Sequence, residues 1–410
     1  MSFFCGARCY QCGKEWEREK FTYLCPSCMG NLEIVYDYSK IKKIAIREYF
    51  QKNKDYSMWR YFPFLPIEEK SPIPLHIGWT PLYPIAQEKR IRLYIKDEGR
   101  NPSASLKDRA SAIALTYAIE KKEKLVTGAS TGNAGSSMAC LCASVGMPAY
   151  IFVPCHAPQA KIAQLMIFGA KVLMVKGNYD KAFDLCLKIS QDLGWYNRNT
   201  GYNPYTREGK KTCAMEICEQ LQWNMPDWVV VSVGDGNILS GLAKGFSDLQ
   251  KTGLIDRVPK LVAVQSTLSN SIAQSINRCQ QGKPLTIESI NATTIADSIS
   301  VDFPRDGIAA VKAILESNGI ALEVTDEEIL ATIPITARQY GVFGEPAGAA
   351  SLAGLQKMLD QNIIKENERV VCVVTGNGLK DVSSAIKAAG TPPLIEADIT
   401  AVKEFLNCVD

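Results

Sequence analysis

The fold of this chain is decided by the stretch Asn101-Pro-Ser-Ala-Ser-Leu-Lys107-Asp108-Arg109. It follows Leu93-Tyr-Ile-Lys-Asp-Glu98, a segment typical of a short strand, and it opens a region with helical periodicity. Lys107 is therefore expected at the start of a helix, near backbone N–H groups that have no helical partner. A lysine in such a place can bind the carbonyl group of a cofactor as a Schiff base. Because an isolated lysine at a helix start is more often a plain surface residue, the hypothesis depends on the loops that follow.

The composition argues against several classes of function. The chain has 410 residues, of which 46% are apolar and 22% charged, with a net charge of +3. This length is enough for two or three domains with their own cores, and the near-balanced charge does not favour nucleic-acid binding. No apolar run reaches the roughly 18 residues that a membrane helix needs. Fourteen cysteines without a secretory signal indicate a reducing compartment. We therefore expect a cytoplasmic protein with neither nucleic acid nor membrane as a partner.

The first 38 residues predict a zinc-ribbon module. Its signature is the spacing Cys9-x2-Cys12-x12-Cys25-x2-Cys28, which is typical of four thiolates around one Zn²⁺ ion. A site with four thiolates has no open position, so we expect the metal to be structural and not catalytic. The alternatives are a ribbon that has lost its metal, or disulfides formed by oxidation.

From Thr80 onward, short apolar runs alternate with longer segments of helical periodicity. Such alternation predicts an α/β protein with parallel-rich sheets whose strands are buried on both faces. Strands are expected at 92–96, 125–127, 149–153, 171–175, 228–233, 261–265 and 370–374. Helices are expected at 107–121, 133–144, 161–168, 179–193, 209–221, 239–249, 306–317, 326–340 and 347–361. The preceding residues 40–75 are a polar and aromatic connector that begins with an exposed helix at 40–54.

A second loop has a composition suited to an anion. It reads Gly128-Ala-Ser-Thr-Gly-Asn-Ala-Gly135 and connects an expected strand to a helix rich in small residues. Hydroxyl groups, glycine amides and a helix N-terminus together bind anions. Ser130 and Thr131 are therefore candidates for binding the carboxylate of a substrate. The alternative is a plain helix cap made by Ser130, Thr131 or Asn133.

Two further loops follow buried strands. The first is Ser232-Val-Gly-Asp-Gly-Asn-Ile-Leu239, whose glycines let backbone N–H groups converge on a phosphate at a helix start. It lacks the third glycine of the dinucleotide fingerprint, and the chain has no ATP-type phosphate loop, so a small phosphorylated cofactor fits better. The second is Val373-Val-Thr-Gly-Asn-Gly-Leu-Lys-Asp381, whose Thr375 hydroxyl can reach a ring nitrogen at a strand end. Taken alone, it is equally a strand-to-helix turn.

A lysine, a carboxylate loop, a phosphate loop and a terminal hydroxyl are, in this order, what pyridoxal 5'-phosphate requires. At these residues the chain resembles the threonine synthases, within the tryptophan-synthase-β-like, fold type II pyridoxal-phosphate enzymes. The resemblance covers nearly the whole chain and includes the cysteine ribbon. The matching segments are Asn31–Tyr36, Met58–Tyr61, Trp79–Leu82, Asn101–Arg109, Ser130–Asn133, Gly234–Asn237, Phe343–Gly348 and Thr375–Asp381.

The resemblance implies a role for each matching residue. Lys107 is expected to form the Schiff base and to act as the general base at the substrate's α-carbon. Asn133 is expected to hydrogen-bond the phenolic oxygen of the cofactor. Thr375 is expected to contact the ring nitrogen, which a neutral hydroxyl partner leaves unprotonated. The cradle for the cofactor phosphate is expected to consist of Gly234, Asp235, Gly236, Asn237 and Ile238.

The resemblance also implies two lobes with the cofactor between them. We expect the larger, cofactor-binding lobe to consist of residues 39–110 and 223–410. A smaller α/β lobe is expected to be inserted at residues 111–222, and the zinc ribbon occupies residues 1–38. We also expect the protein to be a homodimer.

The sequence departs from the family pattern at the site for the substrate phosphate. Members have an arginine two residues after an Asn-Pro pair, whereas Asn203-Pro204 is followed at that position by Thr206. A slip of one residue turns a helical side chain by about 100°, so Arg207 does not take the same place. Arg207, Lys210 and Lys211 are the candidate ligands for the phosphate. In the lysine stretch, the family's threonine, glycine and phenylalanine are replaced by Ser103, Ala104 and Leu106.

The function implied by the resemblance is conversion of O-phospho-L-homoserine and water to L-threonine and phosphate, with an amino acid as the small-molecule partner. One alternative is another β-elimination or β-replacement enzyme that uses the same cofactor, such as a serine/threonine dehydratase. A different class is a non-catalytic paralogue that binds the cofactor and uses its ribbon to bind a protein. The intact Lys107 argues against that last class.

Overall fold

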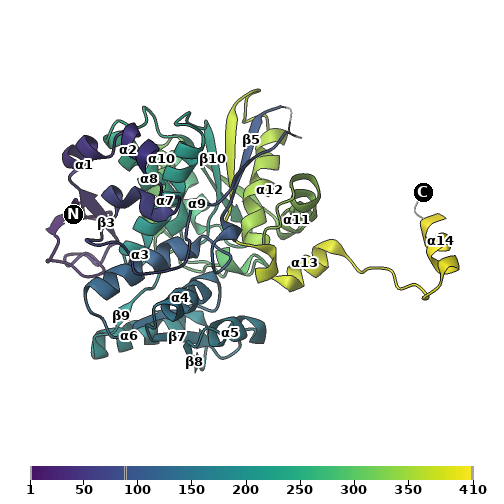
Figure 1. The fold of residues 1–410 in the computed structure, drawn as a ribbon, viewed down its shortest axis with the longest axis horizontal. Helices are drawn as coiled ribbons and strands as arrows, with labels where there is room; N and C mark the ends of the chain where they lie inside the picture. The colour runs from purple at the N-terminus through teal and green to yellow at the C-terminus, as the bar shows by residue number, and fades with distance from the viewer. Residues whose placement is uncertain (1, 87, 89, 408–410) are drawn as a thin grey trace.

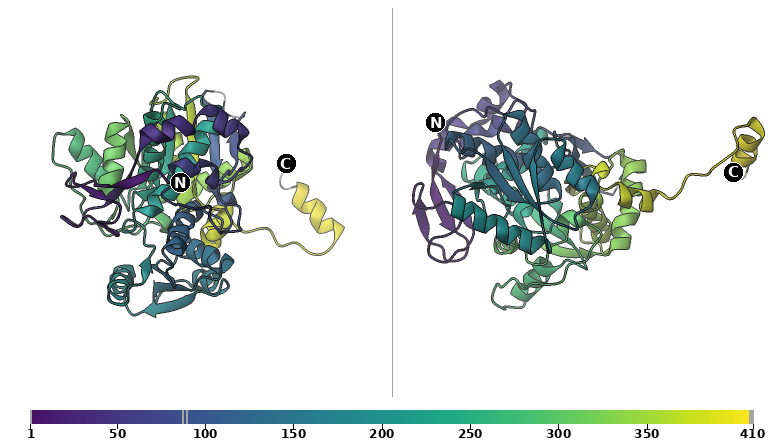
Figure 2. Two further views of the ribbon diagram at one scale, coloured as in Figure 1. Left: turned by 60° about the vertical axis from the view of Figure 1, so that its left-hand side comes forward. Right: turned by 90° about the horizontal axis from the view of Figure 1, so that it is seen from below.

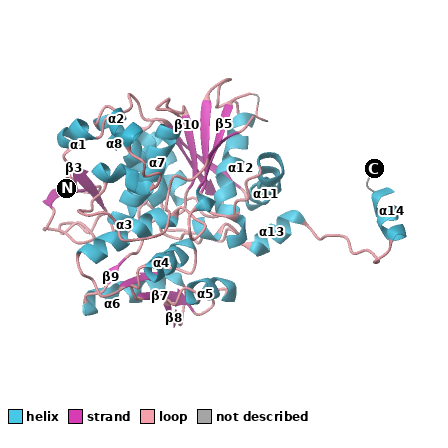
Figure 3. Cartoon of the chain, viewed as in Figure 1, coloured by secondary structure: helices cyan, strands magenta, loops and turns pink. Residues whose placement is uncertain are grey.

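The described residues form three β-sheets, and two of these consist mainly of parallel strands (Figures 1 and 3). The computed structural model describes residues 2–86, 88 and 90–407. The larger parallel sheet lies at the top of the view in Figure 1 and the smaller one at the bottom, with helices between and around them. This architecture confirms the predicted α/β class with parallel-rich sheets.

The larger sheet has six strands in the order β12-β11-β10-β13-β5-β4, and only β4 runs antiparallel to its neighbour. Its strands are β4 (Leu82–Pro84), β5 (Arg92–Asp97), β10 (Trp228–Ser232), β11 (Lys260–Ser266), β12 (Ile320–Val324) and β13 (Arg369–Val374). Successive side chains of a strand point to opposite faces. Val231 therefore belongs to one core cluster with Leu242 of α8 (Asn237–Lys251), and Val230 to another with Leu352 of α12 (Pro346–Asp360). Helices cover both faces, which explains the unbroken apolar runs of the central strands.

Helix α7 (Tyr205–Gln220) runs through the interior of the molecule. Every residue from Tyr205 to Cys218 is buried, because α7 packs between α3 (Lys107–Glu120) and α8. Its charged residues must therefore find partners inside the protein. The other helices near the larger sheet are α9 (Ser271–Gln280), α10 (Gly307–Glu316), α11 (Asp326–Tyr340) and α13 (Val382–Ala389), with the 3-10 turns η2 (Glu98–Arg100), η3 (Asp297–Ile299) and η4 (Gly378–Lys380).

The smaller parallel sheet has four strands in the order β8-β7-β6-β9. They are β6 (Val126–Ala129), β7 (Ala149–Pro154), β8 (Lys171–Val175) and β9 (Tyr196–Asn197), and they pack against α4 (Asn133–Ser144), α5 (Gln159–Met166) and α6 (Tyr179–Leu193). Strand β9 has only two residues, and the next N–H, that of Arg198, donates to the Thr127 carbonyl at 2.8 Å. All four strands lie within residues 111–222. The division into lobes at the boundaries given above remains our proposal.

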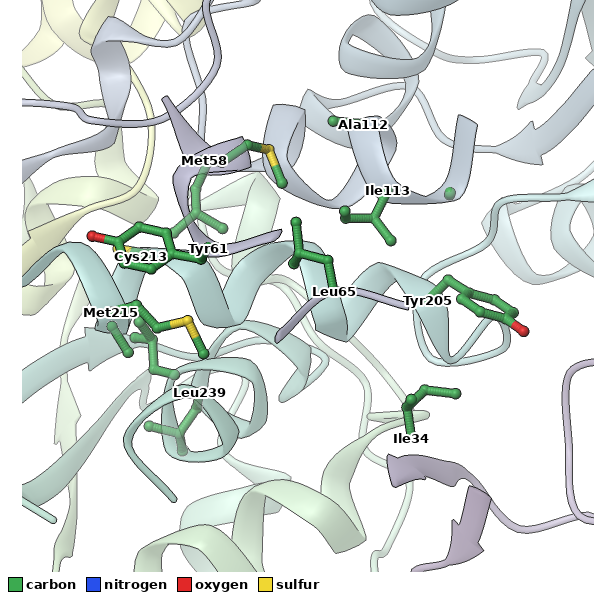
Figure 4. Close-up of a cluster of buried hydrophobic side chains, with 14 of the residues drawn as sticks. Ile34, Met58, Tyr61, Leu65, Ala112, Ile113, Tyr205, Cys213, Met215 and Leu239 are labelled. Atoms are coloured by element: carbon green, nitrogen blue, oxygen red, sulfur yellow. The ribbon is translucent and has the colours of Figure 1, made fainter. Parts of the chain in front are cut away.

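The N-terminal module packs against the body of the protein. Its three antiparallel strands, in the order β2-β1-β3, are β1 (Phe4–Cys9), β2 (Glu15–Glu17) and β3 (Leu32–Tyr36), and the connector that follows contains α1 (Tyr38–Ile44), α2 (Arg47–Lys52) and η1 (Met58–Phe64). Figure 4 shows Ile34 of β3 near Tyr205 of α7, and Met58 and Tyr61 of η1 in the same apolar cluster. The ribbon and the connector therefore complete the core around α7.

Some elements differ from the sequence-based prediction. The single helix expected at 40–54 is two short helices, because Ala45 and Ile46 leave the helical conformation. Strand β12 was not predicted, and four of its five residues are only half-buried at the sheet edge. Helix α14 (Ile399–Asn407) was not predicted either, and it lies away from the rest of the molecule in every view (Figures 1 and 2). Within the described residues, no helix combines the length and the apolar character that a bilayer crossing requires.

Candidate active site

Lys107 is the first residue of α3, and it lines a cavity of about 600 Å³. The loop after β13 fixes the segment before it, because Leu106 N donates to Thr375 O at 2.9 Å and Asn377 N donates to Ala104 O at 3.0 Å. Burial, followed by the positive charge of Arg198, lowers the pKa of Lys107 to about 8. An appreciable fraction of the amine is therefore uncharged near neutral pH, which is the form that attacks a carbonyl carbon.

The loop between β10 and α8 has the shape of a phosphate cradle. Gly236 has a φ of +93°, and a Cβ atom there would lie 2.9 Å from the Asp306 carbonyl oxygen. The positive end of α8 faces the space that this conformation leaves open. Within the described residues, Ser232 Oγ and Asp235 Oδ2 are buried without a hydrogen-bond partner. Burial, followed by the charge of Asp306, raises the pKa of Asp235, which reduces its repulsion of an anion. The loop therefore fits the phosphate group of a cofactor.

Asn133 and the loop before it lie at the carboxyl end of β6, where α4 begins. Asn133 Nδ2 donates to Glu345 Oε1 at 2.6 Å and to Ser298 Oγ at 3.3 Å. Ser130 and Thr131 line the cavity of about 600 Å³ together with Lys107. The loop thus presents hydroxyl groups and a helix N-terminus to the same space as the lysine.

The four sequence segments predicted to carry the chemistry meet at one place. Thr375 is 7% exposed at the end of β13. It lines a recess that connects Lys107 and Asn133 with the phosphate cradle. The predicted cofactor residues that line this recess are Lys107, Asn133, Gly234, Asp235, Gly236, Asn237, Ile238 and Thr375. This donor set fits pyridoxal phosphate, with an amine, a phosphate cradle and a ring-nitrogen partner on separate walls.

A buried network of charges fixes the start of α3. Arg109 binds Glu98 at 2.7 Å and Glu216 of α7 at 2.6 Å, and Lys96 binds Glu216 at 2.8 Å. All four side chains are fully buried. Burial alone would raise the pKa of Glu98, but the charge of Arg109 lowers it to about 2. Because Arg109 is two residues from Lys107, the network determines where the amine sits.

The structure places two of the three predicted phosphate ligands elsewhere. Arg207 donates to Leu32 O at 2.7 Å and pairs with Asp306. Lys211 pairs with Glu208 at 2.6 Å and with a second carboxylate of α8. Arg207 and Lys211 are therefore paired with carboxylates inside the core, and neither is among the described residues that line the cavity. The sequence could not show this, because it does not show that α7 is buried on every side.

Lys210 lies behind the phosphate cradle. Its Nζ donates to Asn237 Oδ1, and the side chain is fully buried. Burial, followed by the charges of Lys107 and Arg198, lowers its pKa far below the ordinary value. An anion bound in the cradle would offset this repulsion. Lys210 therefore faces the loop predicted to hold the cofactor phosphate, and its role in substrate binding stays a prediction.

Two residues of the site were not identified from the sequence. Arg198 lines the cavity beside Asn199 and Thr200, but it follows a strand of only two residues that no periodicity reveals. Glu345 contacts Asn133, and burial raises its pKa to about 7. Glu345 could have been identified from the sequence, because it lies in Phe343–Gly348, one of the segments that match the family.

The four cysteines of the ribbon form a second site. Their sulfur atoms all lie within 4.8 Å of one another, with Cys9 and Cys28 separated by 3.5 Å and Cys12 and Cys25 by 3.7 Å. Tetrahedral coordination at ~2.3 Å per bond places sulfur atoms about 3.8 Å apart. The cluster therefore has the dimensions of a four-thiolate zinc site.

The chain matches the family model described as "Pyridoxal-phosphate dependent enzyme" over residues 73–376. It belongs to that family. Threonine synthase of Methanocaldococcus jannaschii is 40% identical, over 98% of this chain and 99% of that protein. Threonine synthase of Methanosarcina acetivorans is 38% identical, over 97% and 98% of the two chains. Within the pyridoxal-phosphate dependent enzymes, the chain therefore groups with the threonine synthases.

Solved structures show the same fold at lower identity. Processed threonine deaminase isoform 2 of Solanum lycopersicum has a TM-score of 0.64 at 24% identity, covering 75% of this chain and 86% of that one. Diaminopropionate ammonia lyase of Escherichia coli has a TM-score of 0.64 at 18% identity, covering 85% and 91%. These similarities confirm the predicted fold type II architecture.

Proposed function

We propose that the protein converts O-phospho-L-homoserine and water to L-threonine and phosphate. The observation that carries the proposal is the full-length similarity to threonine synthases, 40% identical over 98% of the chain. The site is consistent with it, because Lys107 lines both the recess at the phosphate cradle and the cavity at the hydroxyl-rich loop. Pyridoxal phosphate, when bound, supplies an electron-accepting ring that stabilises negative charge at the substrate's α-carbon.

We assign the binding of cofactor and substrate and the transfer of the proton to separate residues of the chain. Gly234 to Ile238 hold the cofactor phosphate at the start of α8, and Thr375 contacts the ring nitrogen. Ser130 and Thr131 orient the substrate carboxylate at the start of α4. Lys107 moves a proton at the α-carbon, a role that its pKa of about 8 supports. Asn133, held by Glu345, contacts the phenolic oxygen.

A substrate panel tests the proposed function. The purified protein, loaded with cofactor, is given O-phospho-L-homoserine, L-serine and L-threonine, and kcat/KM is measured for each. We expect turnover of O-phospho-L-homoserine to dominate and Lys107→Ala to abolish it while the fold is retained. Preferred deamination of serine or threonine would instead support the dehydratase alternative. Cofactor binding without turnover of any of the three would support the non-catalytic paralogue.

We also propose that Cys9, Cys12, Cys25 and Cys28 bind one structural zinc ion. The sulfur separations support this, and so do the Gln11 and Cys12 backbone N–H groups, which donate to Cys9 Sγ at 3.3 and 3.4 Å. Metal analysis of freshly purified, reduced protein should find about one zinc per chain. Metal-free protein with an intact ribbon would refute the assignment.

The quaternary structure and the location in the cell remain proposals from the sequence. We propose a homodimer in the cytoplasm. Sedimentation equilibrium of the purified protein tests the first, with a monomer at micromolar concentration as the contradicting result. Fractionation of cells that express the protein tests the second.

A further inference from the structure

Arg198 differs from the other buried arginines of the molecule. In the described part of the chain, Arg60, Arg109, Arg198 and Arg207 are each at most 3% exposed. Three of them bind a carboxylate, namely Glu219, Glu98 and Asp306 respectively. Arg198 has no such partner among the described residues, and its Nη2 atom is buried without any hydrogen bond.

The guanidinium group is nevertheless held firmly. Its Nε donates to Ser111 Oγ at 3.1 Å, and its Nη1 donates to Thr200 Oγ1 at 2.8 Å. The backbone is fixed as well, because Arg198 follows β9 and its N–H donates to Thr127 O at 2.8 Å. Two of the three nitrogen atoms are therefore anchored, and the third has no hydrogen-bond partner, on a side chain that lines the cavity of about 600 Å³.

A buried cation without a partner is unfavourable, and proteins pair such charges or use them. Burial lowers the pKa of Arg198 only to about 10, so the group keeps its charge at neutral pH. Its charge also disfavours the protonated forms of Lys107 and Lys210. The cavity lining also includes Asp180, Asp235, Asp297 and Asp302. None of them pairs with Arg198, so its charge is left for an anionic ligand to neutralise.

Three anionic groups would enter this space under the proposed function. The cofactor phosphate has its own cradle at the start of α8, next to Lys210. The substrate carboxylate has the loop at the start of α4, which includes Ser130 and Thr131. The third is the substrate phosphate, a dianion that needs charged donors, and the two loops leave it without one.

We infer that Arg198 binds the leaving phosphate group of the substrate and thereby selects phosphorylated substrates; this rests on the proposed function. The carboxyl end of β9 lies at the same sheet edge as the Ser130 loop, where ligands of parallel sheets bind. Thr206 cannot take this role, because it is fully buried and its hydroxyl donates to Asn203 O at 2.8 Å. The position two residues after Asn203-Pro204 is thus occupied by a structural residue, and Arg198 supplies the cation from the connection between β9 and α7.

Substitutions at Arg198 test the inference in the cofactor-loaded enzyme. Arg198→Gln should lower kcat/KM for O-phospho-L-homoserine by roughly ten- to a hundredfold, the usual effect of losing a hydrogen bond to a charged group. Arg198→Lys keeps the charge but loses the planar fork, so its loss should be smaller. Binding of L-threonine, followed by the change in cofactor absorbance, should not change, because the product has no phosphate. Unchanged kcat/KM in Arg198→Gln would overturn the inference, and so would equal losses for both ligands.

The matched control is Arg305→Gln. Arg305 lines the same cavity but is half-exposed, and its guanidinium lies 4.0 Å from the ring centroid of Phe183. We expect its KM for O-phospho-L-homoserine to stay within about twofold of wild type. A large rise in KM for Arg305→Gln with none for Arg198→Gln would transfer the role to Arg305. Arg257→Gln, on the exposed surface beside Asp227, controls for the loss of one positive charge.

A binding measurement separates failure of this inference from failure of the proposed function. Inorganic phosphate should raise the unfolding temperature of the cofactor-loaded wild type, since a ligand that binds only the folded state stabilises it. Sodium chloride at equal ionic strength is the salt control. Arg198→Gln should lose this stabilisation without a lower unfolding temperature of its own. Suppose that the wild type does not turn over O-phospho-L-homoserine, but phosphate raises its unfolding temperature and not that of Arg198→Gln. The proposed function then fails, and the anion site at Arg198 stands. If phosphate stabilises Arg198→Gln as much as wild type, the anion site is refuted.

Discussion

Replacing the buried Glu216 by Gln should lower the free energy of unfolding by more than the loss of an exposed charge does. Glu216 accepts four hydrogen bonds, two from Arg109 at 2.6 and 2.7 Å, one from Lys96 at 2.8 Å and one from Trp79 N at 2.7 Å. Burial alone would raise the pKa of Glu216, but Arg109 and Lys96 hold it below its ordinary value. The carboxylate is therefore charged at neutral pH and balances one of the two buried cations.

The magnitude follows from the charge count. Lys96 and Arg109 carry two positive charges, and Glu98 and Glu216 carry two negative charges, all on fully buried side chains. Glu216→Gln leaves one positive charge without compensation and turns an amide N–H₂ toward cationic donors. Breaking a buried pair in this way costs about 3–5 kcal/mol, which is a large share of a typical stability of about 5–15 kcal/mol.

The assay is equilibrium unfolding in urea, followed by circular dichroism, with the slope m checked for constancy. The double variant Lys96→Met/Glu216→Gln removes one cation together with the anion, so it should regain at least half of the lost free energy of unfolding. Glu288→Gln is the control, because Glu288 is 61% exposed in its pair with Arg278, and its effect should stay below about 1 kcal/mol. A loss of less than about 1 kcal/mol for Glu216→Gln would refute the view that this network supports the start of α3.

Three further predictions concern the loops of the site. Gly236→Ala should weaken cofactor binding at least tenfold in an absorbance titration, because φ is +93° and the new Cβ would lie 2.8 Å from Ala310 Cβ; unchanged affinity would contradict the cradle. Ala104→Gly should stabilise the protein by about 1 kcal/mol in urea unfolding, because Ala104 has a left-handed φ of +64°; a destabilised variant would show that its methyl group matters more than its backbone. In the cofactor-free protein, Glu345 has a pKa of about 7 against an ordinary 4.5, so its contribution to stability is complete below pH ~4.5 and is lost as pH rises to ~7, about 3 kcal/mol in total. Glu345→Gln should lack this decline, and an unchanged pH profile would disprove the assignment.

The sequence contained most of the site because the chemistry lies in short local patterns. Thr375, the glycines of the phosphate loop and Asn133 follow their strands within four residues, whereas Lys107 begins α3 ten residues after β5 ends. The strands before them belong to two mainly parallel sheets, and each sheet brings its carboxyl ends to one edge. The spacing within each loop therefore determines which side chains meet. The left-handed backbone at Ala104 also explains a departure from the family pattern, since glycine is the residue that adopts this conformation without strain.

The remaining features depend on tertiary structure. Arg207 and Lys211 are close in sequence to the polar loop at 199–203, but α7 is buried all around and both side chains turn to carboxylates in the core. Arg198 follows a strand of two residues, which is too short to produce a periodic pattern of apolar residues in the sequence. That Arg198 has no carboxylate partner becomes clear only when its surroundings are compared with those of the other buried arginines. A sequence shows which charges exist, and the fold shows which of them are left unpaired.

The most direct test of the proposed function is the product of one reaction. The purified, cofactor-loaded protein is incubated with O-phospho-L-homoserine, and the mixture is followed by proton and phosphorus NMR. Threonine and inorganic phosphate should appear in equal amounts, and both should be absent with Lys107→Ala. Phosphate released with 2-oxobutanoate in place of threonine, or no reaction in the wild type, would contradict the assignment of this cavity to threonine synthesis.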